Sequence, residues 1–169
     1  KVLPAESVWA EQMAASGDGH HHAPIVEDLK AEARARGLWN LFLPHATEWT
    51  EGLSNLDYAP LAEISGRSPL APEALNCAAP DTGNMEVLER YGTPEQKKKY
   101  LEPLLEGDIV SCFSMTEPQA GADPREFTCR AVKDGDEWVI NGEKYFSSNA
   151  DLATFLIVMV ITDPTVPVH

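Results

Sequence analysis

Apolar positions recur at helical spacing through the first two-thirds of the chain. Val2, Trp9 and Met13 fall on one face of a helix that is predicted to begin near the first residue. A second helix is predicted to begin at Pro24, because proline is favoured at the first helical position. Gly37 marks its end, since glycine is the usual residue directly after a helix. These signals predict an all-helical start to the chain.

Three more helices are predicted before residue 108. One covers about residues 58–64 and another about residues 82–91, and each is followed by a glycine. The third begins after Thr93–Gln96, which supplies an N-cap, a proline at the first helical position and a glutamine that can close a capping box. This helix is predicted to direct Tyr100, Leu101 and Leu104 inward.

The pattern changes to β after Gly107. A short apolar run at Ile109–Phe113 predicts a strand. Asp134-Gly135 and Asn141-Gly142 lie between β-prone runs, and such pairs favour hairpin turns because both turn positions need positive φ. Three strands in a meander are therefore predicted between about residues 127 and 146, with a fourth over residues 153–161.

The change of pattern near residue 108 predicts an α+β protein. A helical domain is expected over residues 1–108 and an incomplete, antiparallel β domain over residues 109–169.

Composition argues against nucleic-acid binding and against a membrane span. The chain has 169 residues, with 13 Lys and Arg against 27 Asp and Glu and a net charge of −14. This charge opposes a general nucleic-acid surface. The longest apolar run, residues 152–161, is half the length that spans a bilayer, so no membrane span is expected. Three cysteines without a close pair indicate reduced thiols, as in the cytoplasm or the mitochondrial matrix.

Common catalytic and metal patterns are absent from the sequence. The run His20–His22 has no cysteine or carboxylate partner at a ligand spacing, so an exposed loop and no metal are expected. There is no Gly-x-Ser-x-Gly elbow and no Gly-x-Gly-x-x-Gly fingerprint. Nucleophilic hydrolysis and a Rossmann dinucleotide site are therefore not predicted.

The most informative stretch is residues 114–126, SMTEPQAGADPRE. A predicted strand opens here into small residues and glycine, which let a ligand approach the backbone. Exposed backbone N–H groups in such a turn can hold an anion. Taken alone, Thr-Glu-Pro is more typical of an ordinary β-turn.

Three motifs together resemble the acyl-CoA dehydrogenase family. Residues 114–126 resemble its Met-Thr-Glu-Pro-x-x-Gly-Ser-Asp signature, and residues 92–107, GTPEQKKKYLEPLLEG, resemble its Gly-Thr-x-Glu-Gln-Lys helix. Residues 139–150, VINGEKYFSSNA, are similar to its Ile-Asn-Gly-x-Lys-x-Trp-Ile-Thr-Asn-Gly stretch. Residues 38–44 and 79–86 resemble the branch whose eukaryotic members can be fused to a phosphotransferase-like domain. The resemblance covers almost the whole chain.

The resemblance implies that the β domain binds FAD. Residues Phe113, Ser114, Met115 and Thr116 would lie along the flavin ring, with the Thr116 hydroxyl at its polar edge. Gly121 and Ala122 would lie at the pyrophosphate, and Ala122 also near the substrate. The other implied side of the flavin site consists of Phe146, Ser147 and Ser148. The Phe146 ring would pack on the flavin, and the Ser148 hydroxyl would lie near the reactive nitrogen of the flavin.

The family's reaction is α,β-desaturation of acyl-CoA thioesters, with electrons passed to an electron-transfer flavoprotein. A glutamate from a C-terminal helical domain acts as the base, so no catalytic residue is expected within this chain and the chain alone is expected to be inactive. The resemblance also implies a homodimer or homotetramer. The implied location is the cytoplasm in bacteria, or the mitochondrial matrix or peroxisome in eukaryotes.

Three positions depart from the family pattern. Ala122 replaces a serine, Phe146 a tryptophan and Ala150 a glycine. Backbone donors and an aromatic face survive these changes, so flavin binding is still expected. Two alternatives stay open on this fold: an acyl-CoA oxidase or flavin monooxygenase that uses oxygen, and an assembly subunit without catalysis.

Overall fold

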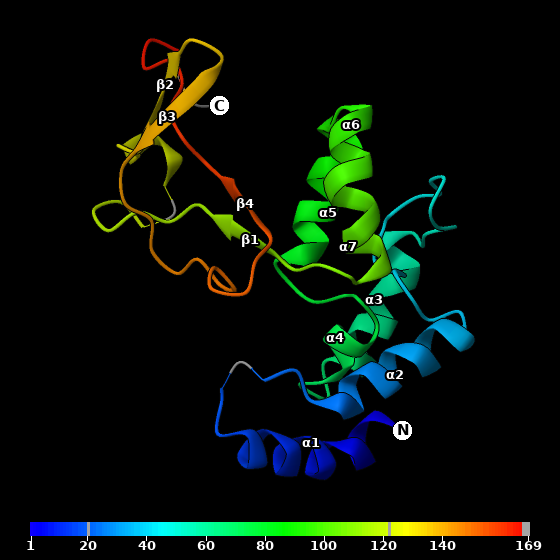
Figure 1. The fold of residues 1–169 in the computed structure, drawn as a ribbon. Coiled ribbons are helices and arrows are strands. Elements are labelled where there is room, and N and C mark those ends of the chain that lie inside the picture. Colours follow the sequence, from blue (N-terminus) through cyan, green and yellow to red (C-terminus); the bar gives the residue numbers. More distant parts are fainter. Residues whose placement is uncertain (20, 122, 167–169) are drawn as a thin grey trace. The chain divides into compact units, whose positions relative to one another are not determined.

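The computed structural model describes residues 1–19, 21–121 and 123–166 (Figure 1). The chain divides into two compact units, residues 1–108 and residues 109–169. The described part of the first unit contains helices and no strands, whereas the second contains four short strands and one 3-10 turn. The expected succession of a helical part and a β part is therefore confirmed.

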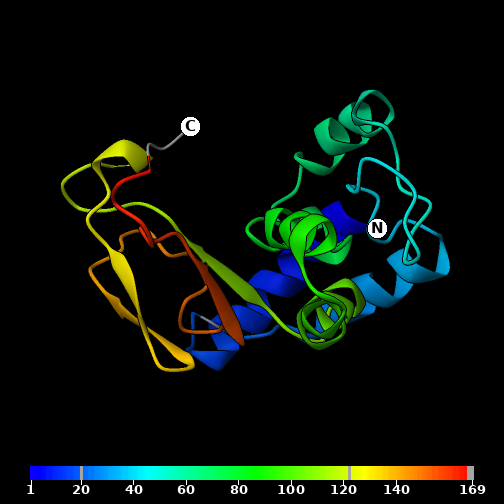
Figure 2. The same ribbon diagram turned by 90° about the horizontal axis from the view of Figure 1, so that it is seen from above.

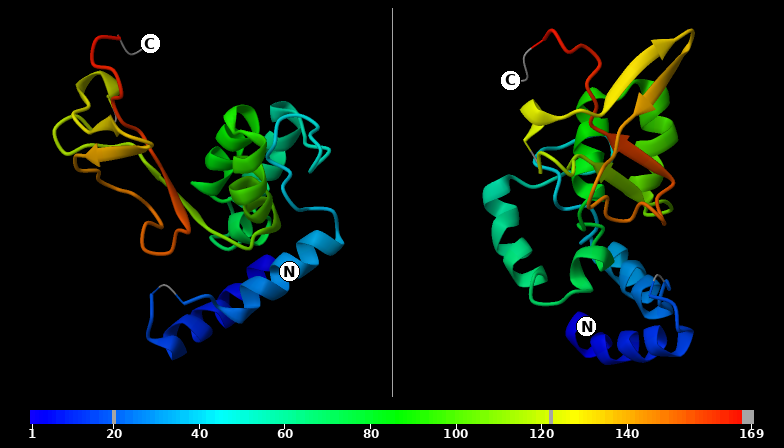
Figure 3. Two further views of the ribbon diagram at one scale, coloured as in Figure 1. Left: turned by 45° about the horizontal axis from the view of Figure 1, so that its top comes forward. Right: turned by 90° about the vertical axis from the view of Figure 1, so that its left-hand side faces the viewer.

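Within residues 1–19 and 21–91, the structure contains five helices. They are α1 (Val2–Ser16), α2 (Pro24–Ala35), α3 (Asn55–Ser65), α4 (Ala71–Ala74) and α5 (Asp81–Tyr91). Helices α1 and α2 pack side by side (Figure 3). Four buried residues form a core among α1, α2 and α4: Ala5, Leu29, Leu70 and Ala74. Only α4, which is one turn long, was missed by the sequence pattern.

Residues 94–106 form one continuous helix with an unusual middle. It consists of α6 (Pro94–Gln96), the π-helical segment η1 (Lys97–Leu101) and α7 (Glu102–Glu106). The predicted capping box is present, since the Thr93 hydroxyl accepts from Gln96 N–H and the Gln96 side chain accepts from Thr93 N–H. The π turn ends just before Pro103, which has no N–H to donate to the preceding turn. Leu101 and Leu104 are buried, as expected.

Side chains from two distant segments satisfy the carbonyl groups at the end of α7. The Leu104 carbonyl accepts from Asn76 Nδ2 (2.9 Å), the Leu105 carbonyl from Asn40 Nδ2 (2.8 Å) and Trp39 Nε1 (2.7 Å), and the Glu106 carbonyl from the Arg34 guanidinium. The last carbonyls of a helix have no partner within it, so these contacts satisfy groups that burial would otherwise leave unpaired. They also tie residues 34–40 and 76 to the end of α7.

The β unit contains two strand pairs. Strand β1 (Ser111–Ser114) pairs with β4 (Phe155–Val158), and β2 (Arg130–Asp134) pairs with β3 (Glu137–Asn141) (Figure 2). The β2–β3 pair is antiparallel, as predicted, but β1 and β4 are parallel. The long chain between β1 and β4 carries the return crossover that a parallel pair requires, so a purely antiparallel domain is wrong. Cys112, within β1, and Cys129, directly before β2, are both buried.

The first hairpin forms where it was predicted, shifted by one residue. Asp134 and Glu137 are opposite each other, so the turn residues are Gly135 and Asp136, with Gly135 at φ 57°. The second predicted hairpin, at Asn141-Gly142, is absent, and residues 142–147 form no strand. Backbone and side-chain donors of Lys144 and Tyr145 instead bond to residues 115–117. This long-range pairing replaces the third strand of the expected meander.

Gly142 has a packing role in place of the predicted turn. A Cβ at this position would lie 2.6 Å from Cys129 Sγ and equally close to its Cα, with φ at 150°. Only glycine lets the chain pass this close to Cys129 and continue toward residue 144.

Substituting two glycines that end helices tests the packing at the end of α7. Gly17 and Gly107 both end helices at positive φ, at 67° and 74°. An added Cβ at Gly17 meets open space, whereas at Gly107 it lies 3.0 Å from the Trp39 ring. We expect Gly17→Ala to cost about 1 kcal/mol for the left-handed backbone. Gly107→Ala should cost about 1–3 kcal/mol more through overpacking.

The measurement is the free energy of unfolding in urea, followed by the helical circular dichroism signal. Equal losses in the two variants would show that the Trp39 ring moves freely away from residue 107.

Candidate functional site

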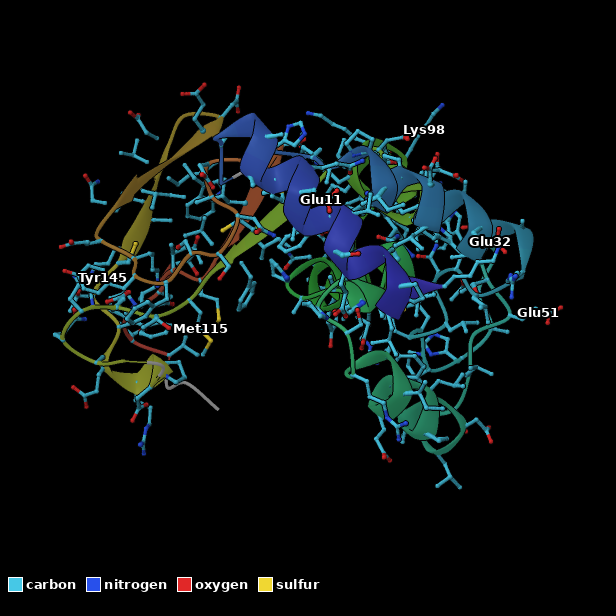
Figure 4. All side chains as sticks on the ribbon, turned by 90° about the horizontal axis from the view of Figure 1, so that it is seen from below. Glu11, Glu32, Glu51, Lys98, Met115 and Tyr145 are labelled. Atoms are coloured by element: carbon cyan, nitrogen blue, oxygen red, sulfur yellow. The ribbon has the colours of Figure 1, made fainter. Side chains whose placement is uncertain are left out.

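The end of β1 is held through three consecutive carbonyl groups. The Ser114 carbonyl accepts from Met159 N–H (3.0 Å), the Met115 carbonyl from Lys144 Nζ (2.8 Å) and the Thr116 carbonyl from Tyr145 N–H (2.8 Å). Met115 and Tyr145 accordingly lie in the same region of the β unit (Figure 4). The family resemblance places residues 113–116 and 146–148 at one site, and the hydrogen bond from Tyr145 to Thr116 brings these two segments together.

The same segment has donors without partners. Within the described part of the chain, no group accepts a hydrogen bond from the backbone N–H of Met115 or Thr116, or from the Thr116 hydroxyl. Both residues are partly buried. A flat heterocycle with acceptor atoms on one edge can use such donors, because unpaired, half-buried N–H groups gain by bonding to it.

Phe146 is exposed in an unusual conformation. Its φ is 56°, in the left-handed region that bulky residues avoid, and 86% of its surface is exposed. Its ring meets the Tyr145 ring edge to face, with centroids 6.0 Å apart. An exposed aromatic ring on a strained backbone is typical of a ligand-contacting position.

Two serines accompany Phe146. Ser114 Oγ donates to Ser147 Oγ (2.9 Å), so Ser147 is engaged with the end of β1. Ser148 N–H donates to the Phe146 carbonyl (2.9 Å), which closes a tight turn after the aromatic residue. The Ser148 side chain is exposed. Of the two hydroxyl groups, that of Ser148 is thus available to a ligand beside Phe146.

Gly121 closes the loop after the Thr-Glu-Pro motif. Its N–H and carbonyl both bond with Glu117, each at 3.0 Å, and its φ is 58°. A Cβ there would meet no atom within 4 Å, so the glycine serves the backbone conformation and leaves open space beside it. Ala122, the expected pyrophosphate and substrate residue, lies outside the described residues.

The most buried polar group of the site is the Glu117 carboxylate, which is 1% exposed. Its two oxygens accept five hydrogen bonds: from Lys144 Nζ (2.9 Å), Gln119 Nε2 (2.6 Å), Thr128 N–H (2.7 Å), Thr128 Oγ1 (3.1 Å) and Cys129 N–H (3.1 Å). These donors come from three separate segments of the chain. The carboxylate therefore joins the start of β2 and residue 144 to the Thr-Glu-Pro turn.

The ionised form of Glu117 is strongly favoured. Burial would raise the pKa of this carboxyl, but hydrogen bonds from the Thr128 backbone, Lys144, Gln119 and Cys129 outweigh burial and lower the pKa from 4.5 to about 2. A general base needs a pKa near the working pH and access to substrate. Glu117 has neither, so its role is structural.

Sequence reasoning did not assign a role to Glu117 or Lys144. Both lie within the quoted motifs, 27 positions apart. Their pairing depends on how the chain returns after β3, which spacing along the sequence does not show. Charged residues inside the two motifs were the available signal, because a charge that becomes buried needs a partner. The motifs also contain Asp123, Arg125, Glu126 and Glu143, and the sequence does not distinguish Glu117 and Lys144 from these.

Other kinds of site find no support in the described residues. These residues contain no group of three or more His, Cys, Asp and Glu that could hold a metal ion. None of the helices in residues 1–19, 21–121 and 123–166 is long and apolar enough to cross a membrane. All three cysteines are free.

Family models match nearly the whole chain. The acyl-CoA dehydrogenase N-terminal domain matches residues 5–108, and the acyl-CoA dehydrogenase middle domain matches residues 112–167. The chain therefore belongs to the acyl-CoA dehydrogenase family.

Curated relatives agree with this assignment. Probable acyl-CoA dehydrogenase FadE2 of Mycobacterium tuberculosis is 49% identical over 99% of this chain, which covers 42% of that protein. Acyl-CoA dehydrogenase family member 11 of Gallus gallus is 53% identical over 88% of the chain, which covers 19% of that protein. The chain thus spans less than half the length of these relatives.

Solved structures show the same fold. A Mycobacterium abscessus protein of this family matches with a TM-score of 0.86 and 48% identity, over 98% of this chain and 43% of that one. A glutaryl-CoA dehydrogenase from Mycobacterium smegmatis, solved in complex with FADH2, matches with a TM-score of 0.62 and 29% identity. That match covers 80% of this chain and 34% of the other.

The low pKa of Glu117 predicts a loss of stability in acid. A folded-state pKa of about 2 against an ordinary 4.5 gives stability that is present above pH 4.5 and lost as the pH falls toward 2. Glu117→Gln should remove this dependence from the β unit. The measurement is urea unfolding of wild type and variant between neutral and acid pH.

Asp123→Asn is the matched control. Arg125 lowers the pKa of Asp123 to about 2 as well, but this ion pair is exposed to solvent and screened by salt. At high salt we expect Glu117→Gln, but not Asp123→Asn, to reduce the loss of unfolding free energy between neutral and acid pH. The same pH dependence of the unfolding free energy in wild type and Glu117→Gln would contradict the ionised, hydrogen-bonded state of Glu117.

Proposed function

We propose that this chain supplies the flavin-binding part of an FAD-dependent acyl-CoA dehydrogenase. The observation that carries the proposal is the meeting of residues 113–116 with residues 145–148, which leaves free backbone donors beside an exposed aromatic ring. The family membership and the FADH2 complex of the M. smegmatis relative support the same cofactor.

The residues fit the parts of FAD by their chemistry. The N–H groups of Met115 and Thr116 and the Thr116 hydroxyl suit the heteroatom edge of the flavin ring. Phe146 offers an aromatic wall, and the exposed Ser148 hydroxyl lies two residues further along the chain. The open space beside Gly121 lets a diphosphate approach the main chain closely, while the Gly121 N–H itself stays bonded to the Glu117 carbonyl. The role of Ala122 at the diphosphate and substrate is proposed on the motif alone.

The proposed reaction is α,β-desaturation of an acyl-CoA thioester. Bound FAD would supply the hydride acceptor for this chemistry. The residues of this chain would bind and orient the ring, and Phe146 would shield it from water. Removal of the substrate's α-proton falls to a base outside the described site, because the Glu117 carboxylate is buried, ionised and fully bonded.

The partners follow from the proposed reaction. An acyl-CoA is the substrate, and an electron-transfer flavoprotein takes the electrons in turn. We further propose a homodimer or homotetramer in the cytoplasm of a bacterium, or in the mitochondrial matrix or peroxisome of a eukaryote. Three free thiols are compatible with these reducing compartments.

Thr116→Val tests the placement of the flavin. The variant keeps the shape of the side chain and removes its hydroxyl, so a bonded ring atom loses its partner at a cost of about 1–3 kcal/mol. This corresponds to a roughly 5- to 150-fold weaker affinity. The measurement is titration of the purified chain with FAD to high concentration, which detects weak as well as tight binding.

Thr154→Val is the control, since Thr154 is an exposed threonine of the same unit outside the proposed site. It should bind FAD as the wild type does. Equal FAD affinity in wild type and Thr116→Val, or no saturable binding at all, would contradict the placement.

The chain by itself is expected to show no turnover. Positioned general-base catalysis contributes typically ~10²–10⁴ in rate, and no base is assigned within residues 1–169. The assay combines the purified chain with FAD, a panel of acyl-CoAs and an artificial electron acceptor without oxygen. Steady dehydrogenation would show that a base lies within these residues. Turnover only when oxygen is admitted would favour an oxidase or monooxygenase.

A further inference from the structure

Lys144 makes two contacts that join the parts of the candidate site. Its Nζ donates to Glu117 Oε1 at 2.9 Å and to the Met115 carbonyl at 2.8 Å. The side chain is 9% exposed, and the ammonium lies 4.1 Å from the centroid of the Phe127 ring. A buried lysine charge is costly unless it is paired, and the Glu117 carboxylate supplies the pair.

The Met115 carbonyl and the Thr116 N–H belong to one planar peptide group. Resonance across this group couples the two ends, so a charged donor on the carbonyl oxygen draws electron density from the N–H. Hydrogen bonds in a chain polarise one another in this way, most strongly where the local dielectric is low. The ammonium of Lys144 therefore makes the Thr116 N–H a stronger donor.

The Thr116 N–H has no acceptor within the described residues. Its strengthened dipole is thus available to a ligand and is not used within the fold. The position of the ammonium is also fixed, because Glu117 is itself held by Gln119, Thr128 and Cys129. The charge is consequently held at a constant distance from the Met115 carbonyl.

We propose that Lys144 is a positioning residue that acts on a bound flavin through the Met115–Thr116 peptide group. This inference rests on the proposed FAD site. A stronger Thr116 N–H favours the electron-rich, reduced form of the ring over the oxidised form. Lys144 therefore raises the reduction potential of the bound flavin without touching it.

A purely structural role would have a different signature. If the Glu117–Lys144 pair served only to close the loop, its loss would open the Glu117–Gly121 and Glu117–Cys129 hydrogen bonds. Hydrogen exchange at the Gly121 and Cys129 amides reports this opening. The chemical shift of the Thr116 amide proton, in contrast, reports the polarisation of its own peptide group.

The first experiment needs no flavin. Amide spectra of this chain are compared among wild type, Lys144→Met, Lys144→Arg and Lys133→Met, a control that removes an exposed lysine of β2. We expect the Thr116 amide proton to move upfield in Lys144→Met and to stay near its wild-type position in Lys144→Arg and Lys133→Met. Gly121 and Cys129 should keep their protection. Should Lys144→Met not fold, the neutral pair Glu117→Gln with Lys144→Met replaces it.

An unmoved Thr116 resonance would overturn the proposal. So would a shift that occurs only together with loss of protection at Gly121 and Cys129, since this outcome assigns the pair a structural role. A shift in the Lys133→Met control as large as that in Lys144→Met would likewise show a non-specific charge effect.

The second experiment measures the reduction potential of FAD bound to the same variants. We expect a lower potential in Lys144→Met than in wild type, and recovery in Lys144→Arg. An unchanged potential in Lys144→Met overturns the proposal. If FAD does not bind, or binds equally to Thr116→Val, the flavin placement itself fails, whereas the Thr116 amide shift still shows whether Lys144 polarises the peptide group.

Discussion

The β unit depends on one buried carboxylate. An ionised, buried Glu117 without partners would cost more than a marginally stable unit can bear, so the unit must fold in a way that brings donors to this carboxylate. Those donors lie at residue 119, at the start of β2 and at residue 144. Satisfying the carboxylate therefore fixes where the chain goes after β3, and this places residues 145–148 beside residues 113–116.

The helical unit meets the same requirement at the end of α7, where the groups to be satisfied are neutral carbonyls and the Arg34 guanidinium is one of the donors. The carbonyls at the end of α7 are satisfied by side chains of Trp39, Asn40 and Asn76. Both asparagines have positive φ, which asparagine tolerates better than most residues. In each unit, polar groups that burial would leave unpaired are satisfied by residues far away in sequence, and these contacts fix the paths of the connecting segments.

Local signals in the sequence predicted most elements correctly. The Thr93 capping box and the glycines after the helices act within a few residues, so they are visible in the chain itself. The hairpin predicted at Asn141-Gly142 does not form, because contacts far apart in sequence decide the path of the chain there. The donors of Lys144 and Tyr145 bond to residues 115–117, and this pairing outweighs a local preference for a hairpin. The parallel β1–β4 pairing is equally non-local. Motifs thus indicated which residues form the candidate site, but not Glu117 and Lys144, which bring them together.

The central claim is that this pairing builds a flavin site. The most direct measurement is a crystal structure of the protein with FAD bound. We expect the edge of the flavin ring within hydrogen-bonding distance of the Thr116 N–H and hydroxyl, with the Phe146 ring against the flavin and Lys144 still bonded to the Met115 carbonyl. A flavin bound elsewhere, or bound here after residues 145–148 have separated from Met115 and Thr116, would contradict it.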